Sequence, residues 1–336
     1  MPELRQDPIT KEWVIIATER AKRPHDFATV RKEEEVPPFL SSCPFCPGNE
    51  AQTPPEVFAY RDSGRKNSSG WRVRVVRNKY PALVRRGTVE RREEGKIFRK
   101  MDGVGIHEVI IESPVHNRLI PLMEDREVED ILFAYRERYN ALKKDPLIKL
   151  IIIFKNHGKS AGTSLEHPHS QLVATPVVPM HIRRRFEVAT VYYDDTGRCL
   201  LCDMIREEKA LGKRVVMETD KFIVFHPFAS RSPFETWIAP KRHLSSFGNV
   251  PDEDIPNLAG VLKTTLLKLY KALNNPDFNY VIHTAPVDDE NKNYYLWHIQ
   301  IIPRLTTMAG FEIGSGIYIN TALPEETAGF MRELVV

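Results

Sequence analysis

The sequence NHGKSAGTSLEHPHSQ occupies residues 156–171 and follows the apolar run LIKLIIIFK. It passes from a predicted strand through a loop of glycine and small hydroxyl residues into a His-Pro-His-Ser-Gln strand. Successive side chains of a strand point to opposite faces, so we expect His167, His169 and Gln171 on one face. Backbone N–H groups of glycine-rich loops approach phosphate oxygens closely. The segment therefore predicts a phosphate-binding loop beside a nucleophilic histidine.

A lone buried histidine belongs more often to a core than to an active site. Here two histidines and a glutamine at a spacing of two stand beside small loop residues, and this combination favours catalysis. A neutral imidazole is nucleophilic near pH 7, and a hydrogen bond to one ring nitrogen leaves the other for the reacting atom. The candidate substrate-binding residues of this segment are Asn156, Gly162, Thr163 and Ser164.

A similar order of elements occurs twice along the chain. In each half a Cys-x-x-Cys pair is followed by two strands, a helix and two more strands, and the second strand ends in a proline closely followed by a histidine. The interval from that histidine to the first histidine of the last strand is 51 residues (167 minus 116) and then 55 (298 minus 243). We therefore expect an α+β fold of two repeats, each a mostly antiparallel sheet with a packed helix, divided into residues 1–195 and 196–336.

The two helices are expected within residues 125–144 and 252–274. In the first, Ile131, Tyr135 and Tyr139 recur at helical spacing, and Asp125 is the candidate N-cap.

The four cysteines form two Cys-x-x-Cys pairs, Cys43 with Cys46 and Cys199 with Cys202. Such pairs are typical of metal sites or redox couples. A redox pair of the thioredoxin type would open a helix after a strand, whereas Cys43 lies between prolines and Cys199 follows the turn-like DDTGR. Zinc ligation is therefore favoured. A single four-cysteine site would need pairs 153 residues apart (199 minus 46) and would leave the histidines without a role.

Composition excludes some classes of function. The chain has 48 basic and 45 acidic residues, and this balance gives no reason to expect a nucleic-acid partner. The charged N-terminal sequence is unlike a signal peptide, and no run approaches the roughly 18 apolar residues of a membrane span. We expect a cytoplasmic protein without a membrane partner, in which the charged segments 31–37 and 84–98 form surface loops.

The HPHSQ stretch resembles the His-Pro-His-x-Gln active-site motif of the galactose-1-phosphate uridylyltransferase family, in the histidine-triad superfamily. The resemblance extends over nearly the whole chain and includes the opening ELRQDPITKEWVI, Arg20 and Arg23 in ERAKRP, and Asn78 before Pro-Ala-Leu. It implies two histidine-triad-like repeats and a nucleotide sugar and a sugar 1-phosphate as substrates. It also implies that His169 attacks the α-phosphorus of the nucleotide sugar and carries the nucleotide covalently, with Gln171 beside it.

Hydrolytic members of the superfamily have a third histidine where Gln171 stands. A carboxamide cannot transfer protons as an imidazole can, so it suits a leaving phosphate that needs no protonation and disfavours activation of water. Transfer is thus expected rather than hydrolysis.

The resemblance also implies metal ligands. The first site would consist of Cys43, Cys46, His116 and His167. The repeat predicts a second site of Cys199, Cys202 and His243, with His298 as the fourth ligand and His283 as the other candidate. Family members with a Glu-and-histidine second site have a glutamate where this chain has the basic stretch HIRRR. Two zinc ions per chain are expected.

The choice of substrate depends on residues near the C-terminus. The resemblance assigns Phe311 and Glu312, in GFEIGSGIYIN, to substrate binding. Uridylyltransferases carry a lysine and a glutamine where this chain has Thr306 and Tyr318, and the segment resembles the plant-type branch that acts on ADP-glucose.

Three function classes remain. The first is uridylyl exchange between UDP-glucose and galactose 1-phosphate by a ping-pong mechanism. The second is phosphorolysis of ADP-glucose through the same intermediate. The third is a non-catalytic, zinc-stabilised nucleotide-binding protein. Open sheet edges and the resemblance also predict a homodimer.

Overall fold

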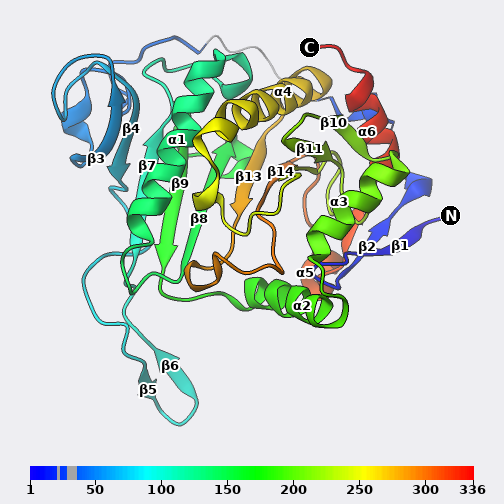
Figure 1. Cartoon of the computed structure of the whole chain (residues 1–336). Coiled ribbons are helices and arrows are strands. Elements are labelled where there is room, and N and C mark those ends of the chain that lie inside the picture. Colours follow the sequence, from blue (N-terminus) through cyan, green and yellow to red (C-terminus); the bar gives the residue numbers. More distant parts are fainter. Residues whose placement is uncertain (21–22, 29–35) are drawn as a thin grey trace.

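A ten-stranded sheet is the centre of the computed structural model, which describes residues 1–20, 23–28 and 36–336 (Figure 1). All neighbouring strands in it are antiparallel. In spatial order they are β3 (Glu56–Arg61), β4 (Trp71–Arg77), β7 (Ile106–Ile111), β9 (His169–Thr175), β8 (Leu150–His157), β13 (Phe278–His283), β14 (His298–Pro303), β12 (Thr236–Pro240), β11 (Phe222–Phe225) and β10 (Val215–Glu218).

This order confirms the predicted α+β fold of two repeats. Read inward from each edge, the first five strands and the last five follow the same sequence of connections, and the two sets meet where β8 pairs with β13. Because that pairing is continuous, the halves share one sheet. The division at residue 195 stays a prediction.

One helix of each repeat covers the same face of the sheet. These helices are α1 (Asp125–Leu142) and α4 (Ile255–Leu273), which pack against each other (Figure 1). The predicted N-cap of α1 was wrong by one residue. Glu124 is the N-cap, and its backbone N–H donates to the Glu127 carboxylate at 2.7 Å. Asp125 is therefore the first helical residue.

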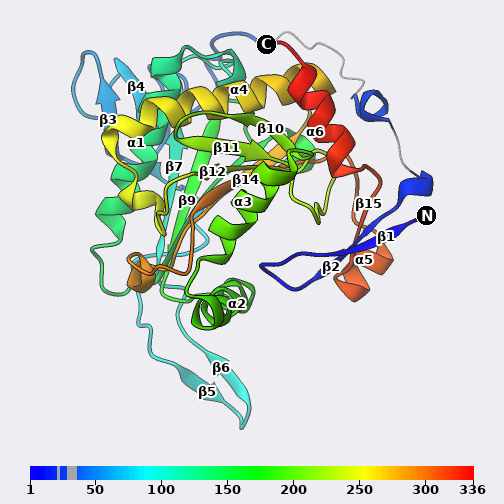
Figure 2. The ribbon, with the colours of Figure 1, turned by 45° about the vertical axis from the view of Figure 1, so that its right-hand side comes forward.

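Smaller elements surround the central sheet (Figure 2). The first residues of the chain pair with its last strand, since β1 and β2 form a hairpin and β15 runs parallel to β2. The elements are β1 (Glu3–Gln6), β2 (Trp13–Ile16), β15 (Tyr318–Asn320), α2 (Met180–Thr196), α3 (Leu200–Leu211), α5 (Gly310–Ser315) and α6 (Pro324–Glu333). None of the helices in the described ranges has the length and hydropathy that crossing a bilayer requires.

One further expectation needs correction, and one helix was missed. The segment 84–98, expected as a loop, contributes to a protruding hairpin of β5 (Arg92–Glu94) and β6 (Phe98–Lys100), whose charged side chains pair across it (Figure 2). The helix α2 was not predicted, although Ile182, Phe186 and Ala189 are buried at helical spacing. Its run of arginines obscured that period. The predicted loop 31–37 lies mostly outside the described residues.

A buried polar cluster lies on the helix side of β9. The Ser170 hydroxyl donates to Glu112, and the Tyr135 hydroxyl lies 2.5 Å from Ser170 and 2.6 Å from the Tyr280 hydroxyl. The Lys155 ammonium donates to the Glu112 carboxylate at 2.5 Å and to the carbonyl oxygen of residue 169 at 3.3 Å. All these side chains are buried. The cluster thus joins β8, β9, β13, α1 and the residue that follows β7.

The Lys155–Glu112 ion pair is expected to be essential for stability. Lys155→Met leaves the Glu112 carboxylate buried without its cation, which should lower the free energy of unfolding by about 3–5 kcal/mol. Lys149→Met is the matched control, because Lys149 pairs at 3.0 Å with Asp288 on the surface and such pairs contribute about 0–1 kcal/mol. Urea denaturation followed by circular dichroism measures both. Equal losses would contradict the role assigned to the buried pair.

Candidate functional site

His169 is the first residue of β9 and is buried, with 7% of its surface exposed. Its Nδ1 lies 2.8 Å from the carbonyl oxygen of His167. A carbonyl oxygen can only accept, so Nδ1 carries the proton and the lone pair is on Nε2. Burial lowers the pKa of His169, which favours the neutral form. The ring of Phe45 lies edge-on at 5.4 Å. These contacts prepare a neutral imidazole with one free lone pair.

Gln171 lies two residues further along β9 and is half-buried on the same face as His169. Its Oε1 lies 2.7 Å from Nε2 of His107, in the neighbouring strand β7. Asn78 follows β4, and its Nδ2 lies 3.1 Å from the same His107 nitrogen. The structure thus brings the predicted residues Asn78 and Gln171 together through a histidine that sequence reasoning missed. The alternation of IHEVII in β7 was the signal that could have placed His107 on this face.

The predicted phosphate loop connects β8 to β9. Asn156 accepts a hydrogen bond on its side chain from Asn279 at 2.8 Å and on its carbonyl oxygen from Thr163 at 2.5 Å. Gly162 has a φ of +88°, which residues with a Cβ rarely adopt. Gly162 and Ser164 are exposed and Thr163 is half-buried. The loop therefore has an anchored base and an open surface.

Four predicted substrate-binding residues lie elsewhere or outside the description. Arg23 is exposed at the start of a 3-10 turn that packs against α4 and α6. Phe311 is 52% exposed on α5, and Glu312 caps that helix by accepting from the backbone N–H of Ala309 at 2.8 Å. Among the described residues, no hydrogen bond or ion pair joins any of these three to His169. The side chain of Arg20 lies outside the described part of the structure.

The first predicted group of metal ligands is assembled and buried. Cys43, Cys46, His116 and His167 bring one ligand atom each to within 4.8 Å of all the others. Nδ1 of His167 lies 3.7 Å from both sulfur atoms and 3.2 Å from Nδ1 of His116. Ligand atoms about 2.0–2.3 Å from a tetrahedral zinc ion lie roughly 3.3–3.8 Å apart. The spacing of the group therefore matches a tetrahedral metal ion.

The protonation of His167 also suits a metal ion. Its Nε2 lies 2.7 Å from the carbonyl oxygen of Ser113, so Nε2 carries the proton and Nδ1 presents its lone pair to the group. Burial lowers the pKa of His167 to about 4, which keeps the ring neutral. His167 is thus oriented as metal-ligating histidines are.

The second group contains three of the four predicted ligands: Cys199, Cys202 and His243. Nδ1 of His243 lies 3.4 Å from the Cys202 sulfur, and its Nε2 lies 3.4 Å from the carbonyl oxygen of Lys292. A hydrogen bond with Cys202 lowers the pKa of the Cys199 thiol to about 5. A hydrogen bond with Cys199 also raises the pKa of His243, so the thiol and the ring share a proton that a metal ion would displace on binding.

His298, predicted as the fourth ligand, is not part of this group. Its ring stacks on Trp237 at 4.3 Å and on His283 at 4.9 Å. Its Nδ1 faces the carbonyl oxygen of Leu296 at 3.4 Å. His283, the other candidate, is held by Gln300 at 2.7 Å. Strand register places His298 where the repeat has His169, two residues beyond the position of His167, so a shared face of the strand was not enough to make it a ligand.

One step of the cysteine argument was also wrong. Cys199 is the N-cap of α3, so this pair does open a helix, contrary to the prediction from DDTGR. The element before it is helix α2 and not a strand. The nearby His243 ring is what continues to favour metal ligation over a redox couple.

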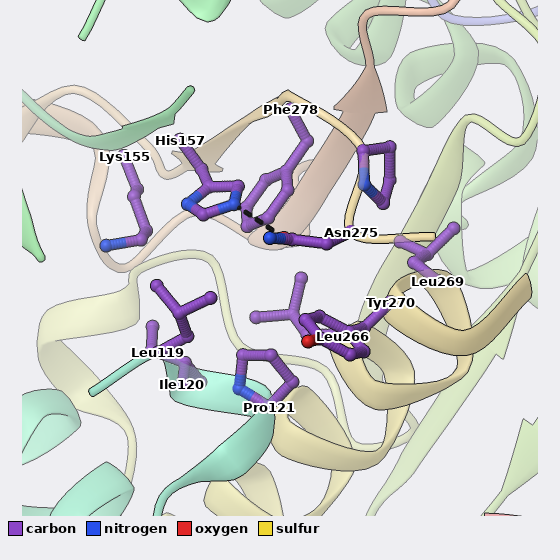
Figure 3. Close-up of a pocket in the computed structure, with 11 residues that line it drawn as sticks. Leu119, Ile120, Pro121, Lys155, His157, Leu266, Leu269, Tyr270, Asn275 and Phe278 are labelled. Carbon is purple, nitrogen blue, oxygen red and sulfur yellow. Dashed lines mark hydrogen bonds between the residues drawn. The ribbon is translucent and has the colours of Figure 1, made fainter. Parts of the chain in front are cut away.

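Two hollows in the surface lie away from His169. One, of about 10 Å³, is lined by Lys155 and His157, whose ring is hydrogen-bonded to Asn275 and lies against Phe278 (Figure 3). It admits about one water molecule and no substrate. The other, of about 900 Å³, lies between β1, α3 and α6 and includes Arg214, which forms an ion pair with Glu208. Neither is lined by His169.

Comparison with known proteins yields a consistent set of relatives. The family models of galactose-1-phosphate uridyl transferase match in succession, the N-terminal domain over residues 1–179 and the C-terminal domain over residues 185–329. The chain is 42% identical over 337 residues to ADP-glucose phosphorylase from Arabidopsis thaliana, covering 99% of this chain and 93% of that protein. It is 31% identical to galactose-1-phosphate uridylyltransferase from Thermotoga maritima, covering 100% and 99%.

A solved structure is similar over the whole length. The crystal structure of an ADP-glucose phosphorylase from Arabidopsis thaliana with bound ADP-glucose has a TM-score of 0.83 to this chain at 37% identity, and 100% of each chain is covered. The fold and the order of elements are therefore shared along the entire chain.

Proposed function

The chain belongs to the galactose-1-phosphate uridylyltransferase family, a family of nucleotidyltransferases, and from this premise we propose that it transfers a nucleoside monophosphate through a covalent intermediate on His169. The observation that carries the proposal is the hydrogen bond from Nδ1 of His169 to the carbonyl oxygen of residue 167. It leaves the Nε2 lone pair for a phosphorus atom.

The proposed transfer has two balanced steps. In the first, the Nε2 lone pair of His169 forms a bond to the α-phosphorus of a nucleotide sugar while the bond from that phosphorus to the bridging oxygen breaks. Sugar 1-phosphate leaves with the electron pair, and the proton stays on Nδ1. In the second, an oxygen of the acceptor phosphate attacks the same phosphorus, and the bond to Nε2 breaks. Neither step needs a net proton transfer, which suits Gln171 beside the nucleophile.

We propose ADP-glucose as the nucleotide donor and inorganic phosphate as the acceptor. The supporting observation is the 42% identity to ADP-glucose phosphorylase over 99% of this chain. Thr306 is exposed and uncharged, and the Tyr318 ring lies 5.2 Å from the guanidinium of Arg231. A neutral Thr306 offers no cation to a sugar phosphate, which is consistent with a smaller acceptor. We therefore rank phosphorolysis of ADP-glucose, the second class of the sequence analysis, as the first candidate.

Uridylyl exchange between UDP-glucose and galactose 1-phosphate is the second candidate. The sequence analysis gives this exchange as the first function class. The 31% identity to the Thermotoga maritima enzyme over the full chain supports it. Both candidates use the same nucleophile. They differ only in the base of the donor and in the acceptor.

We further propose that both cysteine–histidine groups bind zinc, since two sulfurs with one or two imidazoles are the ligands that structural zinc prefers. When bound, the ion at the first group would link the Cys43–Cys46 loop to the residue two positions before His169. Its contribution there is structural. The predicted homodimer and the cytoplasmic location stay predictions.

His169→Ala should abolish formation of the nucleotidyl adduct, because no other group in the proposal supplies the attacking lone pair. Intact-protein mass spectrometry after incubation with ADP-glucose or UDP-glucose measures it. His181→Ala, at an exposed histidine of α2, is the control and should label like the wild type. An acid-labile adduct on the His169→Ala chain would refute the assignment. Absence of an adduct on the wild type would favour the non-catalytic alternative.

The substrate choice is decided by two assays of the purified chain. We expect inorganic phosphate to release ADP and glucose 1-phosphate from ADP-glucose, measured by liquid chromatography. We expect little exchange between UDP-glucose and galactose 1-phosphate under the same conditions, since sites that read hydroxyl groups by hydrogen bonds discriminate strongly. The opposite result would establish the second candidate.

Elemental analysis should find two zinc ions per purified chain. Cys43→Ser should remove one ion and Cys199→Ser the other, because each replaces a thiolate ligand by a poorer one. Loss of the first ion should also reduce activity by displacing the strand of His169. A wild-type content of one ion, lost in Cys43→Ser and kept in Cys199→Ser, would eliminate the second site.

A further inference from the structure

His107 links the Asn78 turn to Gln171. The half-buried His107 ring has three polar neighbours: Nδ1 lies 3.1 Å from the backbone nitrogen of Ala82, and Nε2 lies 2.7 Å from Oε1 of Gln171 and 3.1 Å from Nδ2 of Asn78. Strand register explains the proximity. Gln171 stands opposite Val109 in β7, so His107 is its diagonal neighbour on the same face.

These contacts determine where the proton of His107 is. The backbone N–H of Ala82 can only donate, so Nδ1 must hold a lone pair. A neutral imidazole with a lone pair on Nδ1 carries its hydrogen on Nε2. Nε2 therefore donates to Oε1 of Gln171. In the opposite tautomer, the Nδ1–H of His107 and the backbone N–H of Ala82 would point at each other.

The tautomer in turn fixes the carboxamide of Gln171. Its oxygen is occupied by His107, so its NH₂ group is left for another acceptor, and the Gln171 side chain has no other hydrogen-bond partner among the described residues. Rotating the carboxamide would place NH₂ against the His107 N–H. The Asn78 oxygen accepts from the backbone N–H of Tyr80 at 2.9 Å, so the Asn78 NH₂ group faces the Nε2–H of His107. Two donors cannot bond to each other, so the 3.1 Å approach of Asn78 Nδ2 to His107 Nε2 is a contact and not a hydrogen bond. Phosphate oxygens, which only accept, complement the Gln171 NH₂ group.

We propose that His107 is a positioning residue that holds the Gln171 NH₂ group toward the transferring phosphoryl group. The proposal rests on the function proposed above, in which that group is attached to His169 on the same face of β9. His107 acts through Gln171 and does not touch the reacting atoms. In the alternative, a purely structural role, His107 would only hold the turn through Ala82.

Two variants separate these roles because the carboxamide of each can reproduce the hydrogen bond of only one of the two ring nitrogens. His107→Asn places a carboxamide near the Nδ1 position, where its oxygen can accept from Ala82 but nothing reaches Gln171. His107→Gln places an NH₂ group near the Nε2 position, where it can donate to Oε1 of Gln171. The positioning role predicts that His107→Asn slows adduct formation by about 10–100-fold, the usual loss when the hydrogen-bond partner of a functional residue is removed. His107→Gln should keep most of the rate.

The assay is the single-turnover rate of adduct formation on His169, followed by intact-protein mass spectrometry with ADP-glucose and with UDP-glucose. The loss in His107→Asn should appear in the limiting rate and not in the half-saturating donor concentration. Adding His107→Asn to Gln171→Ala should cause no further loss, because the group it orients is already absent. Thermal unfolding of each variant checks that the fold is intact.

Several outcomes would overturn the proposal. These are a greater loss in His107→Gln than in His107→Asn, a wild-type rate in His107→Asn, or additive losses in the double variant. A wild-type chain that forms no adduct with either donor would instead refute the proposed function, and the role of His107 with it. The two failures are therefore distinguishable in one experiment.

Discussion

The buried ion pair between Lys155 and Glu112 is the interaction on which the site depends. It joins β8 to the residue after β7, and through the carbonyl oxygen of residue 169 it also binds the strand between them. With the Ser170 and Tyr135 hydroxyls, it anchors one face of β9 beneath α1. Since alternate residues of a strand point to opposite faces, this anchoring positions the His169 and Gln171 side chains without touching them.

The roles proposed for three histidines on the other face differ because different backbone groups set their tautomers. A carbonyl oxygen holds the proton on Nδ1 of His169 and frees Nε2. A carbonyl oxygen holds the proton on Nε2 of His167 and turns Nδ1 toward the cysteines. A backbone N–H takes the Nδ1 lone pair of His107 and leaves its Nε2–H for Gln171. The same side chain thus suits a nucleophile, a metal ligand and a positioning residue.

The second repeat has a glutamine at the position of Gln171, but both ends of its carboxamide are bonded within the chain. Gln300 stands opposite Trp237 in β12 as Gln171 stands opposite Val109 in β7, and Glu235 occupies the place of His107. Both ends of the Gln300 carboxamide are bonded within the chain, to Glu235 and His283, each at 2.7 Å. His298 is fully buried under Trp237. Of the two equivalent carboxamides, only that of Gln171 keeps an NH₂ group without a partner among the described residues.

Local patterns in the sequence determined the repeat, the main strands of the central sheet and the two main helices, and the resemblance supplied the ligands of the first cysteine–histidine group. Those features depend on side-chain periodicity and on residue types at short or repeated spacing. Tertiary structure alone decided the partner of Gln171, the position of His298 and the exposed location of Phe311. Each depends on strand register or on packing between segments more than fifty residues apart, and a shift of one residue in register moves a side chain to the opposite face. The Lys155–Glu112 pair likewise exists only once β7, β8 and β9 lie side by side.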